Sequence, residues 1–569
     1  MMINNVVIVD GYTDEPAGLG VPPYIDVYPR YVAGAIWYYN RWAKIKYYTI
    51  DTVRSLGVKF YDEVKNSNLL IIISGVTVPG KYLGGTPITL EELMRIPRLI
   101  EGPIKILAGP VARFGIGLEG GRVAKLPSEL KGSYDLIVTG DVEEVISEIM
   151  EKGSVEGVWA DRVRDSYEKV NEYARLGAKI VKQHPSYGKN LVVEIETYRG
   201  CPRWIVGGCS FCIEPLYGEP IFRCEKGIID EIKALYEIGV LRFRLGRQPD
   251  IYAYKAYGVG EVEFPKPNVE ALRRLFHGIR SVAPRVKTLH IDNVNPGTIA
   301  HHIKESKEVT KIIVEYHTPG DVAAFGVETA DPEVVKKNNL KVYPEEAMEA
   351  IRIVNEVGSI RGYNGLPHLL PGINFVHGLI GETKETYRLN YMFLREILDQ
   401  DLMIRRINIR QVMAFPKTKM WSYGDSIIKK HKSIFKAYKE KIRREIDIPM
   451  LKRVVPKGTI LREVYTEVIV NGRTYARQPG SYPLTVEVPE PLPLGIYMDF
   501  TIVDHSSRSV IGIPYPLDVN KASKRLLKLT PGITKDSLTA ILKNRPLNRE
   551  LYDKLVPEES KKYLHINDK

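Results

Sequence analysis

The sequence predicts an α/β protein of several domains. Residues 1–150 and again residues 190–425 alternate β-branched runs with amphipathic stretches, a pattern typical of parallel sheets covered by helices. After Pro456 the pattern changes to short strands separated by turns, which is typical of a small β-barrel. A length of 569 residues, 44% of them hydrophobic, is enough for several sizeable cores.

The first domain, residues 1–150, is expected to be doubly wound and Rossmann-like. Its predicted strands are the runs VVIVD, LLIIISG, IKILAG and YDLIVTGD. Ligands of such sheets bind at the carboxyl ends of the strands, which makes Asp10, Ser74 and Gly109 candidate cofactor-binding residues. The loops that follow are rich in Gly and Pro, so their backbone can approach a bulky ligand, although ordinary turns need Gly as well. No GxGxxG or Walker lysine motif is present.

A charged, helical connector, residues 151–189, leads to a second α/β unit in residues 190–425. The strand LVVEIETYRG opens this unit, and the later strand-like runs are VLRFRLG, KTLHIDNVNP, AAFGVETA, GINFVHGLIGE and RRINIRQVMAF. About six parallel strands with crossover helices predict a partial (β/α)6 barrel, whose chemistry lies at the strand carboxyl ends. That edge would gather around one cavity the residues Gly246, Asp292, Glu328 and His377. Taken singly, each of them also has an ordinary structural interpretation.

Three cysteines stand within twelve residues, Cys201, Cys209 and Cys212 in the stretch CPRWIVGGCSFC, and the rest of the chain holds only Cys224. Three thiolates on one short loop suit an iron-sulfur cluster. Four-iron clusters normally take four thiolates, so three would leave one iron open to bind a small molecule. A structural zinc site is the alternative and would need a fourth ligand such as His184 or Cys224, although a second Cys-x-x-Cys pair is absent.

Charge and cysteine content indicate which partners and which cellular compartment to expect. A formal net charge of +12 and a pI near 9.1 favour a polyanionic partner, although a basic protein with no such partner is the alternative. Four cysteines are too few and too crowded for a disulfide framework, and the first residues lack the pattern of a secretory signal. No run approaches about eighteen apolar residues. We therefore expect a protein of the reducing cytoplasm with no membrane partner.

Five ordered motifs follow one another in residues 190–425. They are the cysteine loop with Phe211 before its last cysteine and the runs RLGRQPDIYAY, FGVETADPEVVKKNNL, GLIGETKET and INIRQVMAFPKT. Together they resemble the core of the radical S-adenosylmethionine (SAM) superfamily. The whole chain resembles an archaeal group of radical SAM proteins with a cobalamin-binding-like N-terminal domain and a C-terminal helix-hairpin-helix. The spacing Cys-x7-Cys-x2-Cys exceeds the usual Cys-x3-Cys-x2-Cys, which lengthens the loop without removing a ligand.

The resemblance implies a mechanism and a cofactor site. SAM would bind the open iron of a 4Fe-4S cluster, and one electron from a reducing donor would cleave SAM to a radical that abstracts hydrogen from the substrate. By resemblance, Gly246 and Gln248 would lie beside the methionine part of SAM, and Glu328 would lie near its ribose. The adenine would lie beside the segment from Gly378 to Gly381. Asp292 is also placed among the cofactor-binding residues.

The number of cysteines limits the reaction that the resemblance implies. Methylthiotransferases bind a second cluster through three further cysteines, whereas this chain has only Cys224 to spare. Methyl transfer through cobalamin needs no extra cysteine. The first histidine of the chain is His184, so residues 1–150 cannot supply a histidine ligand to cobalt. We therefore expect either cobalamin held without a protein histidine or a domain that has lost cobalamin.

The segment 426–515 is expected to hold a basic helix and a β domain. The run DSIIKKHKSIFKAYKEKIRREID carries eight Lys or Arg against four acids, which a solvated helix face also explains. The strands that follow resemble a TRAM or OB-like barrel, an RNA-binding module. On such a barrel, basic and aromatic residues track phosphates and stack bases, which makes Arg473, Tyr475 and Arg477 the RNA-binding candidates.

The last segment, residues 516–569, resembles a helix-hairpin-helix. In that motif a Gly-containing turn offers backbone amides to phosphate, which makes Gly532 a further RNA-binding candidate. Thr534 stands where the motif usually has its second Gly, and a purely structural helical pair is the alternative. We expect residues 426–569 to form an RNA-docking unit that is separable from the chemistry.

These observations predict a cytoplasmic radical SAM enzyme that modifies RNA, with tRNA favoured, by cobalamin-assisted methylation of an unactivated carbon. One candidate reaction, on chemical fit, converts threonylcarbamoyladenosine to its hydroxynorvalyl form. A first alternative is a radical SAM enzyme that acts on a protein or a small molecule. A second alternative is a non-catalytic nucleic-acid-binding protein with a structural metal site.

Overall fold

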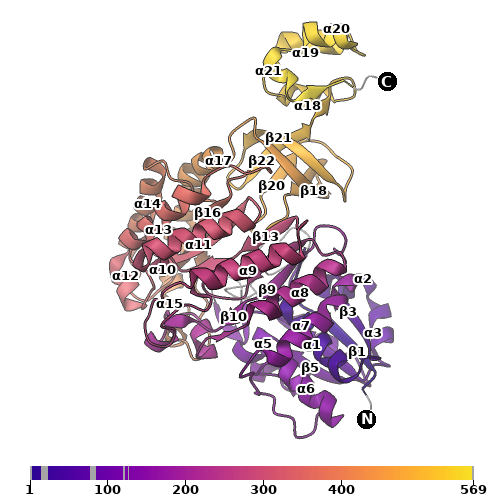
Figure 1. The fold of residues 1–569 in the computed structure, drawn as a ribbon, viewed down its shortest axis with the longest axis vertical. Coiled ribbons are helices and arrows are strands. Elements are labelled where there is room, and N and C mark those ends of the chain that lie inside the picture. The colour runs from indigo at the N-terminus through magenta and orange to yellow at the C-terminus, as the bar shows by residue number, and fades with distance from the viewer. Residues whose placement is uncertain (1–2, 14–22, 77–84, 119–121, 126, 567–569) are drawn as a thin grey trace.

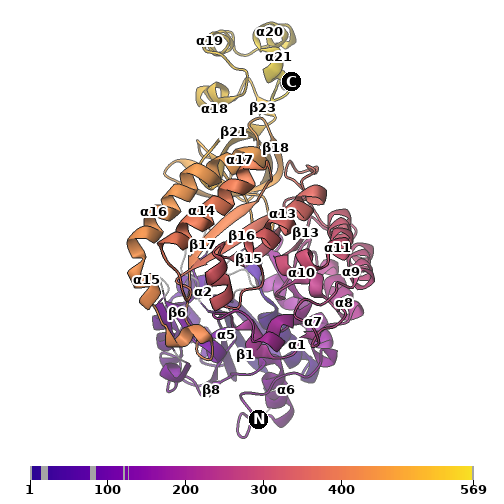
Figure 2. The same cartoon turned by 90° about the vertical axis from the view of Figure 1, so that its left-hand side faces the viewer.

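The computed structural model describes residues 3–13, 23–76, 85–118, 122–125 and 127–566. Figure 1 shows the N-terminal domain in indigo, a larger unit from magenta to red, a small β-barrel in orange and a yellow helical module. Both views place this module at the opposite end of the molecule from the N-terminus, where it projects from the body (Figures 1 and 2). None of the described helices is long and apolar enough to cross a membrane.

The N-terminal domain is built on a parallel five-stranded sheet. In sheet order its strands are β3 (Lys44–Thr49), β1 (Asn5–Asp10), β4 (Leu69–Ile73), β5 (Ile104–Ala108) and β8 (Leu136–Ile137). Successive residues point to opposite faces, so Val7 and Leu70 contribute to one core and Ile8 and Ile71 to another. Helices cover both faces, which confirms the predicted doubly wound domain. One face carries α2 (Ile50–Leu56), α3 (Val58–Val64) and α4 (Leu90–Arg98), and the other α1 (Val27–Tyr39) and α6 (Val142–Lys152).

Residues 24–39 link the N-terminal domain to the second unit. The strand β2 (Tyr24–Ile25) pairs with β9 of the second unit rather than with the first sheet. The helix α1 packs closely on α7 (Glu168–Gly177) because glycines stand where the two helices cross. A Cβ atom at Gly34 would lie 1.8 Å from the carbonyl oxygen of Tyr173. Sequence analysis assigned residues 24–39 to the domain 1–150, whereas they form its junction with the connector helix α7 and with the barrel.

The second unit is an open parallel barrel. Its strands, in spatial order, are β9 (Val192–Glu196), β12 (Arg242–Gly246), β13 (Thr288–Ile291) with its continuation β14 (Asn293–Val294), β15 (Asp321–Glu328), β16 (Leu369–His377) and β17 (Arg406–Gln411). The helices between them are α8 (Glu225–Glu237), α9 (Val269–Val282), α10 (Pro296–His301), α11 (Ile303–Tyr316), α12 (Pro332–Lys337), α13 (Pro344–Gly358) and α14 (Lys384–Asp399). This arrangement confirms the predicted partial (β/α)6 barrel, and β17 is its edge strand.

Three short helices and a closed five-stranded barrel follow β17. The helices are α15 (Ser426–Lys430), α16 (Lys432–Ile442) and α17 (Ile448–Val454), with one π-helical turn (Arg443–Asp447) before the last. The barrel consists, in order, of β18 (Ile460–Val470), β19 (Arg473–Arg477), β20 (Thr485–Val488), β22 (Ser509–Tyr515) and β21 (Tyr497–His505). The predicted small β-barrel is therefore confirmed.

The small barrel inserts a loop, residues 478–484, into the base of the larger barrel. The Tyr482 hydroxyl donates a hydrogen bond of 2.6 Å to Oδ1 of Asp292, and Ser481 Oγ donates to the Ile291 carbonyl at 3.0 Å. The expectation that residues 426–569 are separable from the chemistry is therefore wrong for residues 426–515. These residues complete the packing of the (β/α)6 barrel.

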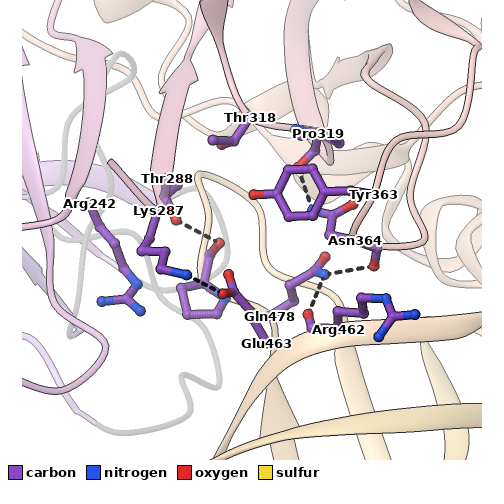
Figure 3. Close-up of a pocket in the computed structure, with 11 residues that line it drawn as sticks. Arg242, Lys287, Thr288, Thr318, Pro319, Tyr363, Asn364, Arg462, Glu463 and Gln478 are labelled. Atoms are coloured by element: carbon purple, nitrogen blue, oxygen red, sulfur yellow. Dashed lines mark hydrogen bonds and ion pairs between the residues drawn. The ribbon is translucent and has the colours of Figure 1, made fainter. Parts of the chain in front are cut away.

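A polar pocket marks this seam (Figure 3). It is a partly open hollow between the amino ends of the parallel strands and the small barrel. Within it, the Lys287 ammonium pairs with Glu463, and the Gln478 amide donates to the carbonyl of Arg462 at 2.8 Å (Figure 3). Because the pocket lies at the amino ends of the strands, it is remote from the cysteine loop at their carboxyl ends.

The C-terminal module has few contacts with the rest of the chain. It comprises β23 (Leu517–Asp518), α18 (Lys524–Leu529), α19 (Lys535–Lys543), α20 (Arg549–Leu555), α21 (Glu558–Lys561) and β24 (Leu564–His565). The helices α18 and α19 form the expected hairpin. A hydrogen bond of 2.6 Å from Ser523 Oγ to Glu490 Oε2 ties the module to the small barrel.

Candidate functional site

The three cysteines lie on a loop at the carboxyl end of β9. Cys201 begins a tight helical turn, and Cys212 donates its backbone N–H to the Cys209 carbonyl at 3.1 Å. The three thiols lie within electrostatic reach of one another. Burial raises the pKa of Cys201 to about 12 and the pKa of Cys212 well above its usual value, so both thiols hold their protons in the metal-free protein. A metal that binds here must displace those protons.

Two asparagines after α12 hold the cysteine loop in place. Asn338 Oδ1 accepts hydrogen bonds from Ser210 Oγ at 2.7 Å and from the Ile380 N–H at 3.1 Å. Asn339 Nδ2 donates to the carbonyls of Val206 and Gly208, each at 2.8 Å. The segment NNLK therefore joins the cysteine loop to the loop after β16, a role that sequence analysis did not assign to it.

Two cations face the thiols. Arg203 Nη1 donates to Cys209 Sγ at 3.2 Å, and the Glu263 carboxylate holds this guanidinium at 2.7 Å. Lys341 interacts electrostatically with all three thiols, and its Nζ lies 3.8 Å from Glu328 Oε1. Sequence analysis missed both residues, because a single Arg or Lys near a loop carries no spacing signal.

Three of the predicted SAM-binding residues, Glu328, Gln248 and Gly246, lie at or just after the carboxyl ends of their strands. Glu328 lies at the carboxyl end of β15, where burial raises its carboxyl pKa against the opposing charge of Lys341. Gln248 lies at the same edge, and its amide oxygen accepts from Thr197 Oγ1 at 3.0 Å. Gly246 ends β12, and a Cβ atom there would lie 1.7 Å from Glu194 Oε1.

Asp292 directly follows β13, level with Gly246 at the end of β12, because Leu245 pairs with Ile291. Its carboxylate pairs with the fully buried Arg244 and accepts from the Tyr482 hydroxyl. The Asp292 carboxylate is therefore engaged by protein groups inside the barrel.

The prediction that His377 faces the same cavity is wrong. The ring of His377 stacks on Tyr387 with centroids 4.5 Å apart, and its Nδ1 lies 3.1 Å from Glu382 Oε2. His377 shares a strand face with Ile373 and Phe375, which pack in the core, because side chains alternate along β16. It is a hydrogen-bonded core histidine.

The neighbouring glycines Gly378 and Gly381 shape the loop after β16. Both have positive φ, at 93° and 85°. The Gly378 N–H donates to the Glu382 carboxylate at 2.8 Å. Asn338 also holds this loop through the Ile380 N–H, so the segment predicted to lie beside adenine is joined to the cysteine loop.

The predicted cofactor residues of the first domain lie at one edge of its sheet. In chain order its strands are arranged 2-1-3-4-5, so the switch point lies between β1 and β4. Asp10 and Ser74 end or follow these two strands, and Gly109 follows β5. The Asp10 carboxylate accepts a hydrogen bond of 2.7 Å from the Tyr47 hydroxyl. Burial raises the pKa of Asp10 to about 7. Parts of the Gly- and Pro-rich loops, residues 14–22 and 77–84, lie outside the described residues.

The carboxyl edge of the first sheet faces the cysteine loop. Phe114 and Val76 from the first domain pack with Ile213, which directly follows Cys212. The guanidinium carbon of Arg113 lies 4.4 Å from the centroid of the Tyr217 ring. The edges at which both sheets would bind their ligands are therefore brought together.

The two candidates for a fourth zinc ligand are engaged elsewhere. Cys224 is exposed and caps α8, where its sulfur accepts from the Gly227 N–H at 3.4 Å. His184 is buried beside Tyr47, and its Nδ1 accepts from the Ser186 N–H at 3.0 Å. Among the described residues, no group of three or more His, Cys, Asp or Glu side chains is placed to hold a metal ion. That finding covers Cys201, Cys209 and Cys212 as well, so their thiols are not drawn together as in an assembled metal site, and Cys224 and His184 offer them no fourth ligand.

The predicted RNA-binding arginines carry carboxylate partners. Arg473 pairs with Glu487, and Arg477 pairs with Glu467 at 2.7 Å, while Tyr475 lies between them on β19. Gly532 has a φ of 84°, and a Cβ atom there would lie 2.4 Å from Glu559 Cγ. The turn of the helical hairpin is therefore packed against α21.

Sequence comparison places the chain among archaeal relatives. No family model matches it. The chain is 50% identical over 516 residues to the uncharacterized protein MJ0274 of Methanocaldococcus jannaschii, covering 90% of this chain and 93% of the relative. This chain belongs to the MJ0274 family. An uncharacterized protein of Archaeoglobus fulgidus is 44% identical and covers 92% of this chain and 93% of its own length.

Solved structures similar to this MJ0274-family chain include cobalamin-dependent radical SAM enzymes. The radical SAM methyltransferase TsrM from Kitasatospora setae is 15% identical with a TM-score of 0.47, over 73% of this chain and 75% of that chain. The cobalamin-dependent SAM radical enzyme OxsB is 12% identical with a TM-score of 0.45, over 76% of this chain and 56% of that chain. Methylornithine synthase PylB is 16% identical with a TM-score of 0.27, over 46% of this chain and 66% of that chain.

Proposed function

We propose that this protein is a radical SAM enzyme that holds a 4Fe-4S cluster on Cys201, Cys209 and Cys212. The observation that carries the proposal is the position of these thiols at the carboxyl edge of an open parallel barrel, beside half-buried Lys341 and buried Glu328. Four-iron clusters use cysteine thiolates, and three leave one iron for SAM. When bound, the cluster would supply the electron that breaks the carbon-sulfur bond of SAM.

The residues around the loop fit such a group. Deprotonated thiols would leave negative charge in a buried place, and Arg203 and Lys341 supply positive charge at that point. Lys341 would also attract the carboxylate of SAM, and Glu328 could accept hydrogen bonds from hydroxyl groups of its ribose. The packing of Phe211 and Cys209 against the core below the loop limits the entry of water.

The first domain is proposed to hold cobalamin for methyl transfer to carbon. Its 2-1-3-4-5 sheet presents the switch point between β1 and β4 as the place for a large ligand, and this edge faces the cysteine loop. Residues 1–150 contain no histidine, so bound cobalamin should give a base-off absorption spectrum. Unchanged activity without cobalamin, together with no binding at tens of micromolar, would contradict this part of the proposal.

An RNA substrate, with tRNA favoured, is proposed on the basis of charge and shape. The chain carries a net charge of +12, and the projecting C-terminal module resembles a helix-hairpin-helix. Methylation of threonylcarbamoyladenosine to its hydroxynorvalyl form is one reaction that this chemistry would serve. The ion pairs of Arg473 and Arg477 favour a second candidate, a radical SAM enzyme with a protein or small-molecule substrate.

The nucleosides of tRNA test the choice of substrate. A strain that lacks the protein should lose one methylated nucleoside and accumulate its unmethylated precursor, as measured by mass spectrometry of digested tRNA. A plasmid copy of the gene should restore the nucleoside, whereas a Cys209→Ala copy should not. Identical nucleoside profiles in all strains would favour the protein or small-molecule substrate.

A further inference from the structure

The edge strand β17 lines the barrel lumen with charged and polar side chains. Side chains alternate along a strand, so Ile407 and Ile409 pack in the core while Arg406, Asn408 and Arg410 share the opposite face. Asn408 Nδ2 donates to Asn374 Oδ1 of the neighbouring strand β16 at 2.7 Å. The lumen face of β17 is therefore polar, and Asn374 extends it onto β16.

Arg406 has no carboxylate partner among the described residues. Its guanidinium donates to Asn408 Oδ1 and stacks over the Tyr482 ring, with its Cζ atom 3.9 Å from the centroid. The pKa of Arg406 is lowered to about 9, chiefly by burial and in smaller part by the nearby charges of Arg410 and Arg508. A cation held inside a protein without a counter-charge is costly, and a bound anion would remove that cost.

Further cations lie near Arg406, and the acids in the same region are paired with other basic residues. Arg508, on the hairpin between β21 and β22, lies within electrostatic reach of Arg406 and Arg410. Lys439 and Arg443 border the same region, where the acid Asp447 pairs with Arg443. Towards the cysteine loop, Glu328 interacts with Arg410 but pairs with Lys341. A net positive charge therefore remains beside β17.

The strands next to β17 carry small residues on this face. Ala324 and Gly326 on β15 and Gly372 on β16 present little or no side chain. Gly372 pairs with Arg406, and a Cβ atom there would lie 3.1 Å from Arg406 Cγ and 2.7 Å from Val322 Cγ1. A larger side chain would displace Arg406, so glycine preserves its position.

We propose that the lumen face of β17 binds a phosphate group of the substrate through Arg406, Arg410 and Arg508. A single carboxylate is matched by one guanidinium fork, whereas a cluster of three guanidinium groups suits the larger charge and three oxygens of a phosphate. The inference rests on the proposed function, since it specifies the substrate of that site. The phosphate could be the terminal phosphate of an RNA or that of a small phosphate ester, since both are monoesters with the same charge and the same three terminal oxygens.

Binding of uridine 5′-monophosphate to the full-length protein tests this inference, with uridine as the unphosphorylated control. The uracil base is chosen so that an adenine site for SAM does not capture the probe. At constant ionic strength, isothermal titration should show at least about tenfold tighter binding of the monophosphate than of uridine, because charge-assisted hydrogen bonds contribute about 1.5–3 kcal/mol each. Arg406→Gln and Arg410→Gln should each weaken binding of the monophosphate about tenfold and leave the affinity for uridine unchanged.

The control Arg95→Gln removes an exposed positive charge on α4 and should leave both affinities unchanged. Circular dichroism and thermal unfolding establish that each variant is folded. Equal affinity of wild type for monophosphate and uridine, or equal loss in Arg95→Gln, would overturn the inference. Displacement of the monophosphate by tRNA at physiological salt would identify RNA as the source, and displacement by ribose 5-phosphate alone would identify a small ester.

Iron content and SAM cleavage, measured on the same samples, separate this inference from the proposed function. A wild-type protein that cleaves SAM but binds the monophosphate no more tightly than uridine contradicts only the inference. A protein that binds the monophosphate through Arg406 but assembles no iron cluster contradicts only the radical mechanism.

Discussion

At the residue scale, buried charge around the cysteine loop matters as much as the cysteines. Lys341 is the one cation that contacts Glu328 and also lies within reach of all three thiols. Lys341→Met should weaken SAM binding at least about tenfold, because it removes the cation and leaves Glu328 buried without its partner. Equilibrium binding of SAM to the reconstituted protein measures this, with Lys336→Gln on the exposed side of α12 as the matched control. Equal SAM affinity in Lys341→Met and wild type would show that Lys341 does not contribute to SAM binding.

The sequence predicted some of these residues and not others, for physical reasons. The cysteine triad and Glu328 could be named as candidates because spacing and ordered motifs single them out. Arg203 and Lys341 were not found, because their role depends on burial that brings segments 130 or more residues apart together, as in the contact of Arg203 with Asn339. His377 was misplaced because a position near a strand end does not reveal which face it occupies.

At the scale of elements, the crossing of α1 and α7 joins the first domain to the barrel. A Cβ atom at Gly34 would lie 1.8 Å from the Tyr173 carbonyl oxygen, and one at Gly177 would lie 1.8 Å from the Arg30 carbonyl oxygen. Gly34→Ala should therefore force the helices apart and lower the free energy of unfolding by about 3 kcal/mol. Urea unfolding measures the loss, and Ala437→Val on the exposed face of α16 is the control. A variant as stable as wild type would show that the crossing tolerates a wider spacing.

A buried histidine should make stability depend on pH. Burial lowers the pKa of His184 to about 3, whereas the unfolded chain has an ordinary histidine pKa near 6.5. Below about pH 6.5 the unfolded chain binds a proton that the folded chain does not, so stability is lost as pH falls. Relative to His184→Asn, wild type should lose about 1.4 kcal/mol per pH unit between pH 6 and 4.

Urea unfolding of both proteins at several pH values measures that difference. Groups such as Asp10, whose pKa burial raises, change stability in the opposite direction but contribute equally to both proteins. Parallel pH profiles of wild type and His184→Asn would contradict a neutral buried His184.

Strands were predicted where their pattern is strong. The strand β4 is a fully buried apolar run, and β1 and β5 are mostly buried and apolar, a pattern that the sequence displays directly. The edge strand β3 (KIKYYT) was missed because its burial alternates, so its residues resemble an amphipathic segment. The strand β2 has two residues, which is too short to show any period.

At the scale of the whole molecule, the small barrel packs as one unit with the (β/α)6 barrel, whereas the last module projects from it. Tyr482 reaches Asp292 across 190 residues of sequence, a contact that no local pattern predicts. A chain that ends at residue 425 should therefore be insoluble or unfolded, because the base of the (β/α)6 barrel would be exposed. A chain that ends at residue 516 should keep the fold, the cluster and SAM cleavage, yet bind tRNA more weakly than the full chain.

Size-exclusion chromatography and circular dichroism measure folding of both truncated chains, and filter binding at physiological salt measures tRNA affinity. A soluble, folded chain of residues 1–425 would refute the structural role of the inserted loop. Equal tRNA affinity of the full chain and the chain ending at residue 516 would refute the docking role of the C-terminal module.

The most direct test of the central claim is the metal content of anaerobically reconstituted protein, read together with its absorption spectrum and its cleavage of SAM to 5′-deoxyadenosine. We expect about four irons per chain, a brown chromophore and SAM cleavage. All three should be lost in Cys201→Ala, Cys209→Ala and Cys212→Ala and retained in Cys224→Ser, because Cys224 caps α8 away from the triad. Stoichiometric zinc without iron in the wild-type protein, or loss of the cluster in Cys224→Ser, would contradict the account.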